Sequence, residues 1–306
     1  MVKTSRKGSW YEIIIPKEWA RCSLDHLLRH IWKAPKKMIH ALRMEQKVLV
    51  NGRSPDWNKL FIPGDKLQLH LFQEEEPSAV PAYHPIEILF EDDHLLILNK
   101  PAGMDTHPNE PGQINTLANA AAFHIQASGE TLNVRHIHRL DRDTTGAVLF
   151  SKTALAGAIL DRMLEERKIK RTYLAITDGL ITQKKGKIIK PIGRDRHHSV
   201  RRRVSPTGQK AVTNYEVIRL MSKEHKTLVR CSLETGRTHQ IRVHFSDMGH
   251  PLSGDTLYGG SSSYIRQALH AVKMELLHPL TGEVLTCHAP FKDDPAIFQN
   301  IDLYSI

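Results

Sequence analysis

The stretch around Asp141 constrains the fold more than any other part of the chain. A polar segment ends at Gly146, the residue type that best permits a backbone turn, and leads directly into the apolar run at 148–150. This order predicts a carboxylate held in a turn at the start of a buried strand. Arg139 and Arg142 flank Asp141, and neighbouring positive charge favours an ionised carboxylate. The stretch therefore predicts an environment suited to a nucleophile.

Two simpler interpretations of this stretch stand beside the catalytic one. Aspartate and threonine side chains often bond their own backbone, so the segment could be a solvated turn. Asp141, Asp143, Thr145 and Gly146 also nearly fit the first half of a calcium-binding loop. The twelfth position of such a loop needs a bidentate glutamate, and here it is Lys152. The sequence therefore argues against calcium and leaves the turn as the alternative.

The nine residues from His138 to Gly146 read H-R-L-D-R-D-T-T-G. This run resembles the H-R-L-D-x-x-T-S-G signature of the RluA/RluD family of RNA pseudouridine synthases. Thr145 stands where the family usually has serine, and it keeps the hydroxyl group. The resemblance implies that Asp141 is the catalytic residue. It also implies that the chain converts uridine in RNA to pseudouridine with no cofactor and no metal.

Three further motifs resemble the same family and occur in the expected order. N-K-P-A-G at 99–103 is similar to the first family motif, whose loop flanks the active site. The strand-like run at 170–177 is similar to the motif whose tyrosine, here Tyr173, lies against the target uracil. G-R-T-H-Q-I-R-V-H at 236–244 is similar to the motif whose first arginine, here Arg237, pairs with the catalytic aspartate.

The resemblance implies a role for each residue of the site. Asp141 either attacks the anomeric carbon of the ribose or removes its 2′ proton, and both routes remain open. Tyr173 and Ile241 would enclose the uracil, with Tyr173 also a candidate proton acceptor. Arg237 would orient Asp141, and Arg139 would support the site. Because the target base must leave its stack, we expect base flipping or a single-stranded loop as substrate.

The charge of the chain favours a nucleic-acid partner. It carries 43 lysines and arginines against 33 aspartates and glutamates, a formal net charge of +10. Basic side chains displace the counterions that condense on nucleic acid, so such an excess favours a polyanion. Nine basic residues and one acidic residue lie between Lys184 and Arg203. We expect this turn-rich segment to form a basic arm over the site, with a solubilising loop as the alternative. Its expected RNA contacts are Arg194, Arg196, Arg201, Arg202 and Arg203.

Residues 1–75 are predicted to form a small separate unit. Residues 10–15 indicate an edge strand, and Ser23 is expected to cap a helix. Two helices, a strand that ends in Asn-Gly and a G-D-x-L stretch resemble the small RNA-binding module first seen in a ribosomal protein. Residues 44–47 depart from that module, which usually has a shorter, glycine-containing link there, so a structural cap is the alternative. The second helix would carry a basic side that includes Lys36, Lys37 and Arg43.

The remaining sequence divides into a linker and a catalytic domain. Residues 76–85 are rich in proline and are expected to be semi-extended. The catalytic domain is expected at 86–306, and the family resemblance runs from about residue 86 to residue 291. Strands dominate this part, and the glycine patterns of P-loops and dinucleotide-binding folds are absent. We therefore expect an α+β fold around a mixed, largely antiparallel sheet, in a monomeric protein.

Cysteine usage and hydropathy bear on the compartment. The three cysteines lie far apart with no C-x-x-C pair, which fits a reducing compartment better than a disulfide framework or a zinc site. No apolar run approaches the roughly 18 residues of a membrane span, and the first 15 residues lack the apolar segment of a signal peptide. We therefore expect a soluble cytoplasmic protein.

The leading hypothesis is isomerisation of uridine to pseudouridine in structured RNA, with ribosomal RNA favoured over transfer RNA. A non-catalytic RNA-binding or ribosome-assembly factor on the same scaffold is the alternative. A glycosidase is disfavoured because that chemistry normally needs two carboxylates facing across the scissile bond. Here the predicted partner of Asp141 is a cation, Arg237.

Overall fold

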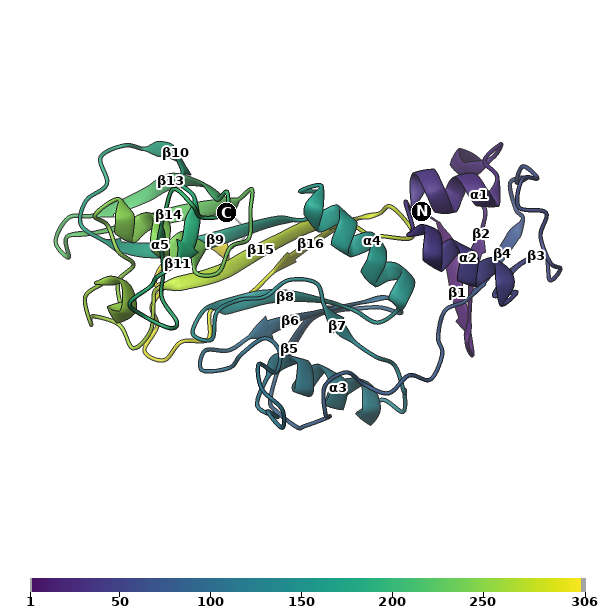
Figure 1. Cartoon of the computed structure of the whole chain (residues 1–306), viewed down its shortest axis with the longest axis horizontal. Helices are drawn as coiled ribbons and strands as arrows, with labels where there is room; N and C mark the ends of the chain where they lie inside the picture. Colours follow the sequence, from purple (N-terminus) through teal and green to yellow (C-terminus); the bar gives the residue numbers. More distant parts are fainter. Residues whose placement is uncertain (1, 304–306) are drawn as a thin grey trace.

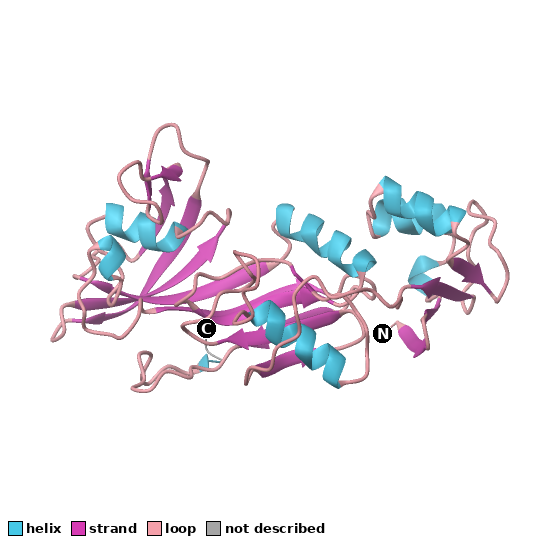
Figure 2. Ribbon diagram, turned by 60° about the horizontal axis from the view of Figure 1, so that its bottom comes forward, coloured by secondary structure: helices cyan, strands magenta, loops and turns pink. Residues whose placement is uncertain are grey.

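The strands of this protein form two sheets and a hairpin. The computed structural model describes residues 2–303, and within that range the strands build a four-stranded sheet, a ten-stranded sheet and a two-stranded hairpin. Figure 1 shows the N-terminal sheet and its helices at one end of an elongated molecule and α5 near the other end. Figure 2 shows the strands of the large sheet running through the body of the molecule. The predicted α+β fold is confirmed.

The small sheet has the strand order β1-β2-β4-β3, with antiparallel neighbours throughout. Ser23 Oγ accepts a hydrogen bond from the His26 N–H, so the predicted helix cap is present. The prediction that residues 10–15 form an edge strand is wrong, because β2 pairs with both β1 and β4. The elements are β1 (Lys3–Lys7), β2 (Trp10–Ile14), η1 (Lys17–Trp19), α1 (Leu24–His26), the π-helical η2 (Leu27–Ile31), α2 (Lys36–Met44), β3 (Val48–Val50) and β4 (Lys66–His70).

The large sheet follows the path β10-β13-β14-β9-β15-β8-β6-β5, with β16 paired to β15 and β7 paired to β8. A separate antiparallel hairpin joins β11 (Ile192–Arg194) to β12 (Arg202–Val204). The strands of the large sheet are β5 (Glu87–Glu91), β6 (Leu95–Lys100), β7 (Arg135–His136), β8 (Thr145–Ser151), β9 (Lys170–Asp178), β10 (Lys185–Ile189), β13 (Val212–Met221), β14 (Lys226–Leu233), β15 (Leu269–Leu277) and β16 (Val284–His288).

A short parallel pairing between β8 and β15 positions the loop that carries Asp141. Among the named strands of the described chain, only β8 and β15 pair in parallel, through Thr145 with His270 and Gly146 with Ala271. Gly146 has a φ of +113°, and an added Cβ would lie 2.3 Å from the Ala271 carbonyl oxygen. Glycine is therefore required for this close approach, and the approach fixes where the loop before β8 leaves the sheet.

Three helices accompany the part of the large sheet that the structure describes. Figure 1 shows α3 (Leu117–Ala127) and α4 (Ala154–Glu165) on opposite sides of β6 and β8. Thr116 and Thr153 cap these helices, each through a side-chain oxygen that accepts a backbone N–H. The third helix, α5 (Gln240–Asp247), is followed by the 3₁₀ turn η3 (Thr256–Tyr258), and it packs near β12 of the hairpin.

The N-terminal part is docked against the body of the molecule. Buried apolar side chains of both parts belong to one continuous core, so the contact does not rest on the connecting segment alone. Polar contacts across the boundary join Trp32 Nε1 to the Leu280 carbonyl at 3.3 Å, Lys33 Nζ to Glu166 at 2.9 Å and Arg6 Nη1 to Glu130 at 3.0 Å.

Residues 2–303 contain neither a helix suited to span a membrane nor a cluster of metal-binding side chains. None of their helices has both the length and the apolar character needed to cross a membrane. No group of three or more histidine, cysteine, aspartate or glutamate side chains in this range is arranged to hold a metal ion. Cys22, Cys231 and Cys287 are buried free thiols.

Candidate active site

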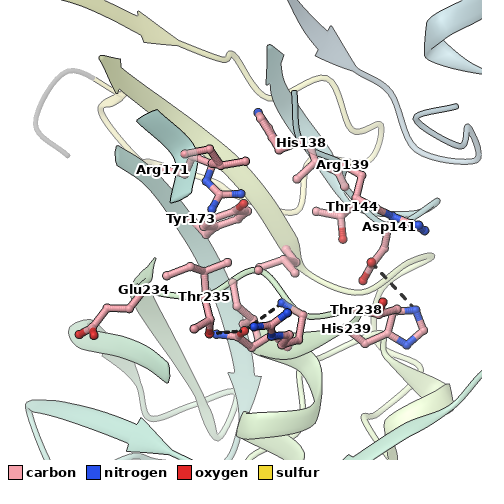
Figure 3. A pocket seen from close by; sticks show the side chains of 18 of the residues that line it. His138, Arg139, Asp141, Thr144, Arg171, Tyr173, Glu234, Thr235, Thr238 and His239 are labelled. Atoms are coloured by element: carbon pink, nitrogen blue, oxygen red, sulfur yellow. Dashed lines mark hydrogen bonds and ion pairs between the residues drawn. The ribbon is translucent and has the colours of Figure 1, made fainter. Parts of the chain in front are cut away.

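A cavity of about 580 Å³ lies between the loop that precedes β8, the strand β9 and the start of α5 (Figure 3). The end of α4 and the segment at 233–239 complete its wall. The fold therefore brings together residues that are about 100 positions apart in the sequence. The cavity is lined by every residue that the sequence analysis assigned to catalysis or its support: Arg139, Asp141, Tyr173, Arg237 and Ile241.

Asp141 forms an ion pair with Arg242 on α5. Arg242 Nη1 lies 3.2 Å from Asp141 Oδ2, and the same guanidinium donates to both oxygens of Asp255, at 2.7 and 2.9 Å. Burial alone would lower the pKa of Arg242, but the two carboxylates outweigh it and raise that pKa above its usual range. Arg242 is thus a permanent cation, and its two bonds to Asp255 hold it in position to bond Asp141.

The predicted pairing of Arg237 with Asp141 is wrong. In the described part of the chain no hydrogen bond or ion pair joins these residues, and Arg237 Nε donates to the Lys210 carbonyl at 3.2 Å. The reason is the position of the helix start. Arg237 precedes α5 and is exposed, whereas Arg242 lies within the first turns of the helix and is 6% exposed. The sequence signal that could have identified Arg242 is its place between the apolar residues Ile241 and Val243.

Tyr173 and Ile241, which the sequence analysis expected to enclose the uracil, form apolar walls of the cavity. Each is only 3% exposed, one on β9 and the other on α5. Figure 3 shows Arg171 beside the ring of Tyr173. Burial raises the pKa of Tyr173, and Arg171 partly opposes the shift. The phenol therefore keeps its proton near neutral pH, which favours a packing role over a role as a base.

Lys100 ties the first motif to the loop of Asp141, a role that the sequence analysis did not assign. Its side chain is fully buried, and Nζ donates to the carbonyls of Pro101 at 2.9 Å, Met104 at 2.6 Å and Arg142 at 2.7 Å. Burial lowers the pKa of Lys100 to about 7, and the carboxylate of Asp141 opposes that shift. Lys100 therefore anchors Arg142, the residue after Asp141, through the backbone carbonyl of Arg142.

Further hydrogen bonds hold both ends of this loop. Thr106 Oγ1 donates to the Leu140 carbonyl and accepts from the Leu140 N–H, both at 3.1 Å. At the other end, Thr145 Oγ1 lies 2.6 Å from His270 Nδ1 and accepts from Arg266 Nη2 at 2.9 Å. Because these partners are buried, the carboxylate of Asp141 projects from a rigid backbone.

His239 lies on the other side of Asp141. Its Nε2 is 4.0 Å from Asp141 Oδ1, and its Nδ1 is 2.8 Å from the hydroxyl of Tyr258 (Figure 3 marks the contact with Asp141). Burial lowers the pKa of His239, and the charge of Asp141 acts in the opposite direction. The imidazole therefore faces the carboxylate in its neutral form near pH 7.

The second half of the predicted basic arm forms the β11–β12 hairpin beside the cavity, whereas its first half includes β10 of the large sheet, which carries Lys185 and Lys187. The backbone N–H of Arg202 donates to the Tyr258 hydroxyl at 2.9 Å, and the Arg201 guanidinium lies 5.6 Å from the centre of the Tyr258 ring. Tyr258 in turn contacts His239. The predicted RNA contacts are distributed over this hairpin, with Arg194 on β11, Arg202 and Arg203 on β12, and Arg196 and Arg201 in the connecting turn.

The other predicted RNA contacts lie on α2 of the N-terminal part. Lys36 and Lys37 are exposed there. Arg43 lies 4.3 Å from the centre of the Trp57 ring and 3.5 Å from Asp25, so part of its binding capacity is already used. In the described structure none of the three lines the cavity.

Comparison with known proteins identifies relatives of this chain. The model of the family described as RNA pseudouridylate synthase matches residues 94–247, and that of the RluD ribosomal pseudouridine synthase N-terminal domain matches residues 11–67. An uncharacterized RNA pseudouridine synthase of Bacillus subtilis, YhcT, is 50% identical over 291 residues, which cover 95% of this chain and 96% of the relative.

Two other proteins extend the comparison. The ribosomal large subunit pseudouridine synthase D of Nitrosomonas europaea is 38% identical over 297 residues, covering 93% of this chain and 86% of its own. Among solved structures, human RNA pseudouridylate synthase domain containing 1 superposes with a TM-score of 0.56 at 26% identity, covering 71% of this chain and 86% of its own.

Proposed function

Because this chain belongs to the family of RNA pseudouridine synthases, which isomerise uridine in RNA, we propose that its substrate is ribosomal RNA and that Asp141 acts on the ribose. The chain matches relatives named as ribosomal large subunit pseudouridine synthases over most of its length. Those names support ribosomal RNA as the substrate class.

The observation that carries the role of Asp141 is its ion pair with Arg242 in the wall of the cavity. The reaction requires an ionised carboxylate near the anomeric carbon in a site that excludes most water. Asp141 has an 18% exposed side chain, and Arg242 supplies the opposite charge that such a carboxylate needs away from bulk solvent. Arg242 bonds Asp141 Oδ2, so Oδ1 is not engaged by that guanidinium and keeps lone pairs that can act on the ribose.

The cavity suits the course of the reaction. The bond from ribose C1′ to uracil N1 breaks, the base turns in place, and C1′ is joined to uracil C5, which then loses its proton. Asp141 begins this sequence either by attack on C1′ or by removal of the 2′ proton. The detached base must be retained between steps, and Tyr173 and Ile241 offer two apolar surfaces for it. A volume of about 580 Å³ is within the range of small-molecule sites.

RNA delivery would use the two basic regions outside the cavity. The β11–β12 hairpin would bind phosphates next to the target uridine, and α2 would bind a more distant part of the RNA. We assign residues 1–75 to an RNA-binding domain, 76–85 to a linker and 86–306 to the catalytic domain. The match of residues 11–67 to an N-terminal domain of ribosomal pseudouridine synthases supports the first assignment.

The test is release of tritium from RNA labelled at uracil C5, because the reaction expels that proton. Wild type, Asp141→Asn and Asp143→Asn are compared on ribosomal and transfer RNA transcripts. Asp143→Asn is the matched control: it removes a carboxylate two residues away, whose contact is the Gly103 N–H at 3.1 Å. We expect release from ribosomal RNA to fall at least about 100-fold in Asp141→Asn and less than about threefold in Asp143→Asn.

Three outcomes would contradict parts of the proposal. Normal release by Asp141→Asn would exclude the role of that residue. Release from transfer RNA alone would exclude ribosomal RNA as substrate. No release by wild type from any RNA, with tight binding retained, would favour the RNA-binding factor.

A further inference from the structure

The two oxygens of Asp141 have different neighbours. Oδ2 accepts from Arg242 at 3.2 Å, while Oδ1 faces His239 Nε2 at 4.0 Å (Figure 3). The second distance is too long for a hydrogen bond, and a movement of about 1 Å would form one. Oδ2 is therefore fixed by a hydrogen bond, and Oδ1 has a possible donor nearby that does not yet bond it.

The backbone of His239 is held in an uncommon conformation. Its φ of 58° and ψ of 21° are in the left-handed region, which a residue with a side chain adopts at a cost. His239 is also the N-cap of α5, yet its side chain makes no capping bond. Its ring is instead directed to Asp141 on one side and Tyr258 on the other. The strain thus coincides with a ring that contacts the catalytic carboxylate.

The hydrogen bonds of Tyr258 determine which ring nitrogen of His239 carries the proton. The Tyr258 hydroxyl accepts from the Arg202 N–H at 2.9 Å, so its own proton is available for His239 Nδ1 at 2.8 Å. Burial disfavours the doubly protonated ring. The neutral ring then has its proton on Nε2, the atom that faces Asp141. The opposite tautomer would direct a lone pair at a carboxylate.

Tyr258 also connects this arrangement to the basic hairpin. Arg202 is on β12, and the Arg201 guanidinium lies over the same ring that Arg242 approaches to 5.0 Å. Tyr258 itself is only 4% exposed, so it has little freedom to move independently of these neighbours. The hairpin and His239 therefore share one buried neighbour, Tyr258.

We propose that His239 and Tyr258 are positioning residues that couple the β11–β12 hairpin to Asp141. RNA phosphates that dock on the hairpin press Tyr258 and His239 inward, and the Nε2–H of His239 closes on Asp141 Oδ1. The carboxylate is then held on both sides when the substrate is present. This inference rests on the proposed role of Asp141 and adds a link from RNA binding to the orientation of that residue.

Single substitutions test the two links separately. His239→Asn tolerates the left-handed backbone but is too short to reach Asp141, whereas His239→Gln keeps an N–H donor at that reach. We expect kcat to fall about tenfold in His239→Asn and Tyr258→Phe with KM within about twofold, and less than about threefold in His239→Gln. Tyr215→Phe is the control: it removes a hydroxyl from another buried tyrosine, which packs on Phe245.

The double variant distinguishes coupling from general damage. If the Tyr258 hydroxyl acts only through His239, Tyr258→Phe causes no further loss of kcat in the His239→Asn background. Losses that multiply in the double variant would overturn the coupling. So would equal losses in His239→Asn and His239→Gln, or a normal kcat in all single variants.

A spectroscopic measurement is independent of activity. Nitrogen-15 shifts of the His239 ring in the full chain report its tautomer, and we expect the proton on Nε2 in the wild type and a mixture in Tyr258→Phe. A proton on Nδ1 in the wild type would overturn the inference even if Asp141 is catalytic. Normal activity of Asp141→Asn would instead overturn the proposed function, so the two failures are distinguishable.

Discussion

Removal of Arg242 should damage stability and activity by two separable routes. Asp255 has a side chain that is 1% exposed, and both of its oxygens are bonded to Arg242. Arg242→Met leaves that carboxylate buried without a counter-charge, and the loss of one partner from a buried pair costs about 3–5 kcal/mol. It also removes the bond that fixes Asp141 Oδ2, and misplacement of a reacting group costs about 100-fold in rate.

A second substitution separates these effects. Asp255→Asn in the Arg242→Met background removes the unpaired charge, so most of the lost stability should return. Tritium release should remain about 100-fold below wild type, because Asp141 still lacks its partner. Urea unfolding of each variant gives the stability, and release from ribosomal RNA gives the activity.

Arg237→Met is the matched control. It removes an exposed arginine of the same cavity, whose contact is the Lys210 carbonyl, and should cost about 1 kcal/mol or less. The reasoning is refuted if Arg242→Met unfolds at the wild-type urea concentration or keeps more than about a third of the activity. It is equally refuted if Arg237→Met has the larger effect on release.

Three other predictions follow from the fold and the charges. Gly146→Ala should lower the free energy of unfolding by about 3 kcal/mol or more, because its Cβ would lie 2.3 Å from the Ala271 carbonyl oxygen. Gly282→Ala, whose Cβ would have no atom within 4 Å, should lower it by about 1 kcal/mol. Equal losses in urea unfolding would contradict the close approach of β8 to β15. Burial lowers the pKa of His270 from 6.5 to about 4, so the unfolded chain binds the proton first as pH falls and the stability should decline between those pH values. The decline should be smaller in His270→Asn. Urea unfolding at pH 7 and pH 5 measures the decline, and equal declines in wild type and variant would exclude a contribution from His270. Arg194→Ala with Arg203→Ala should raise KM with little change in kcat and reduce the slope of log affinity against log salt by about 2; an unchanged slope would remove the hairpin from the RNA contact.

The parts of the site that the sequence predicted are those that belong to contiguous motifs. Asp141, Tyr173 and Ile241 each lie in a short run whose residue types limit the backbone, and all three line one cavity. The turn at Gly146 predicted a strand start, and β8 begins one residue earlier. Local signals were sufficient there because turn, strand and motif coincide.

The errors concern side-chain direction and pairing across the chain. Arg237 and Arg242 lie in one motif, and the choice between them depends on where α5 begins, which a left-handed residue at 239 determines. No role was predicted for Lys100, because its three carbonyl partners come from two loops that only the tertiary fold brings together. Strand β2 is central rather than at an edge because residues 3–7, which lack an alternating apolar pattern, pair beside it.

The docking of the N-terminal part against the body sets a spacing. Lys33 binds Glu166, and the neighbouring residues Glu165 and Arg167 line the catalytic cavity, so the N-terminal part adjoins the rim of the site. Helix α2 begins three residues after Lys33, so the docking restrains its position relative to the cavity. If RNA contacts both α2 and Asp141, as proposed, a uridine would react only when the fold of the RNA places it at this distance from the segment bound to α2. Selection then depends on the shape of the substrate, and two sites with unrelated sequences are equivalent if these distances agree.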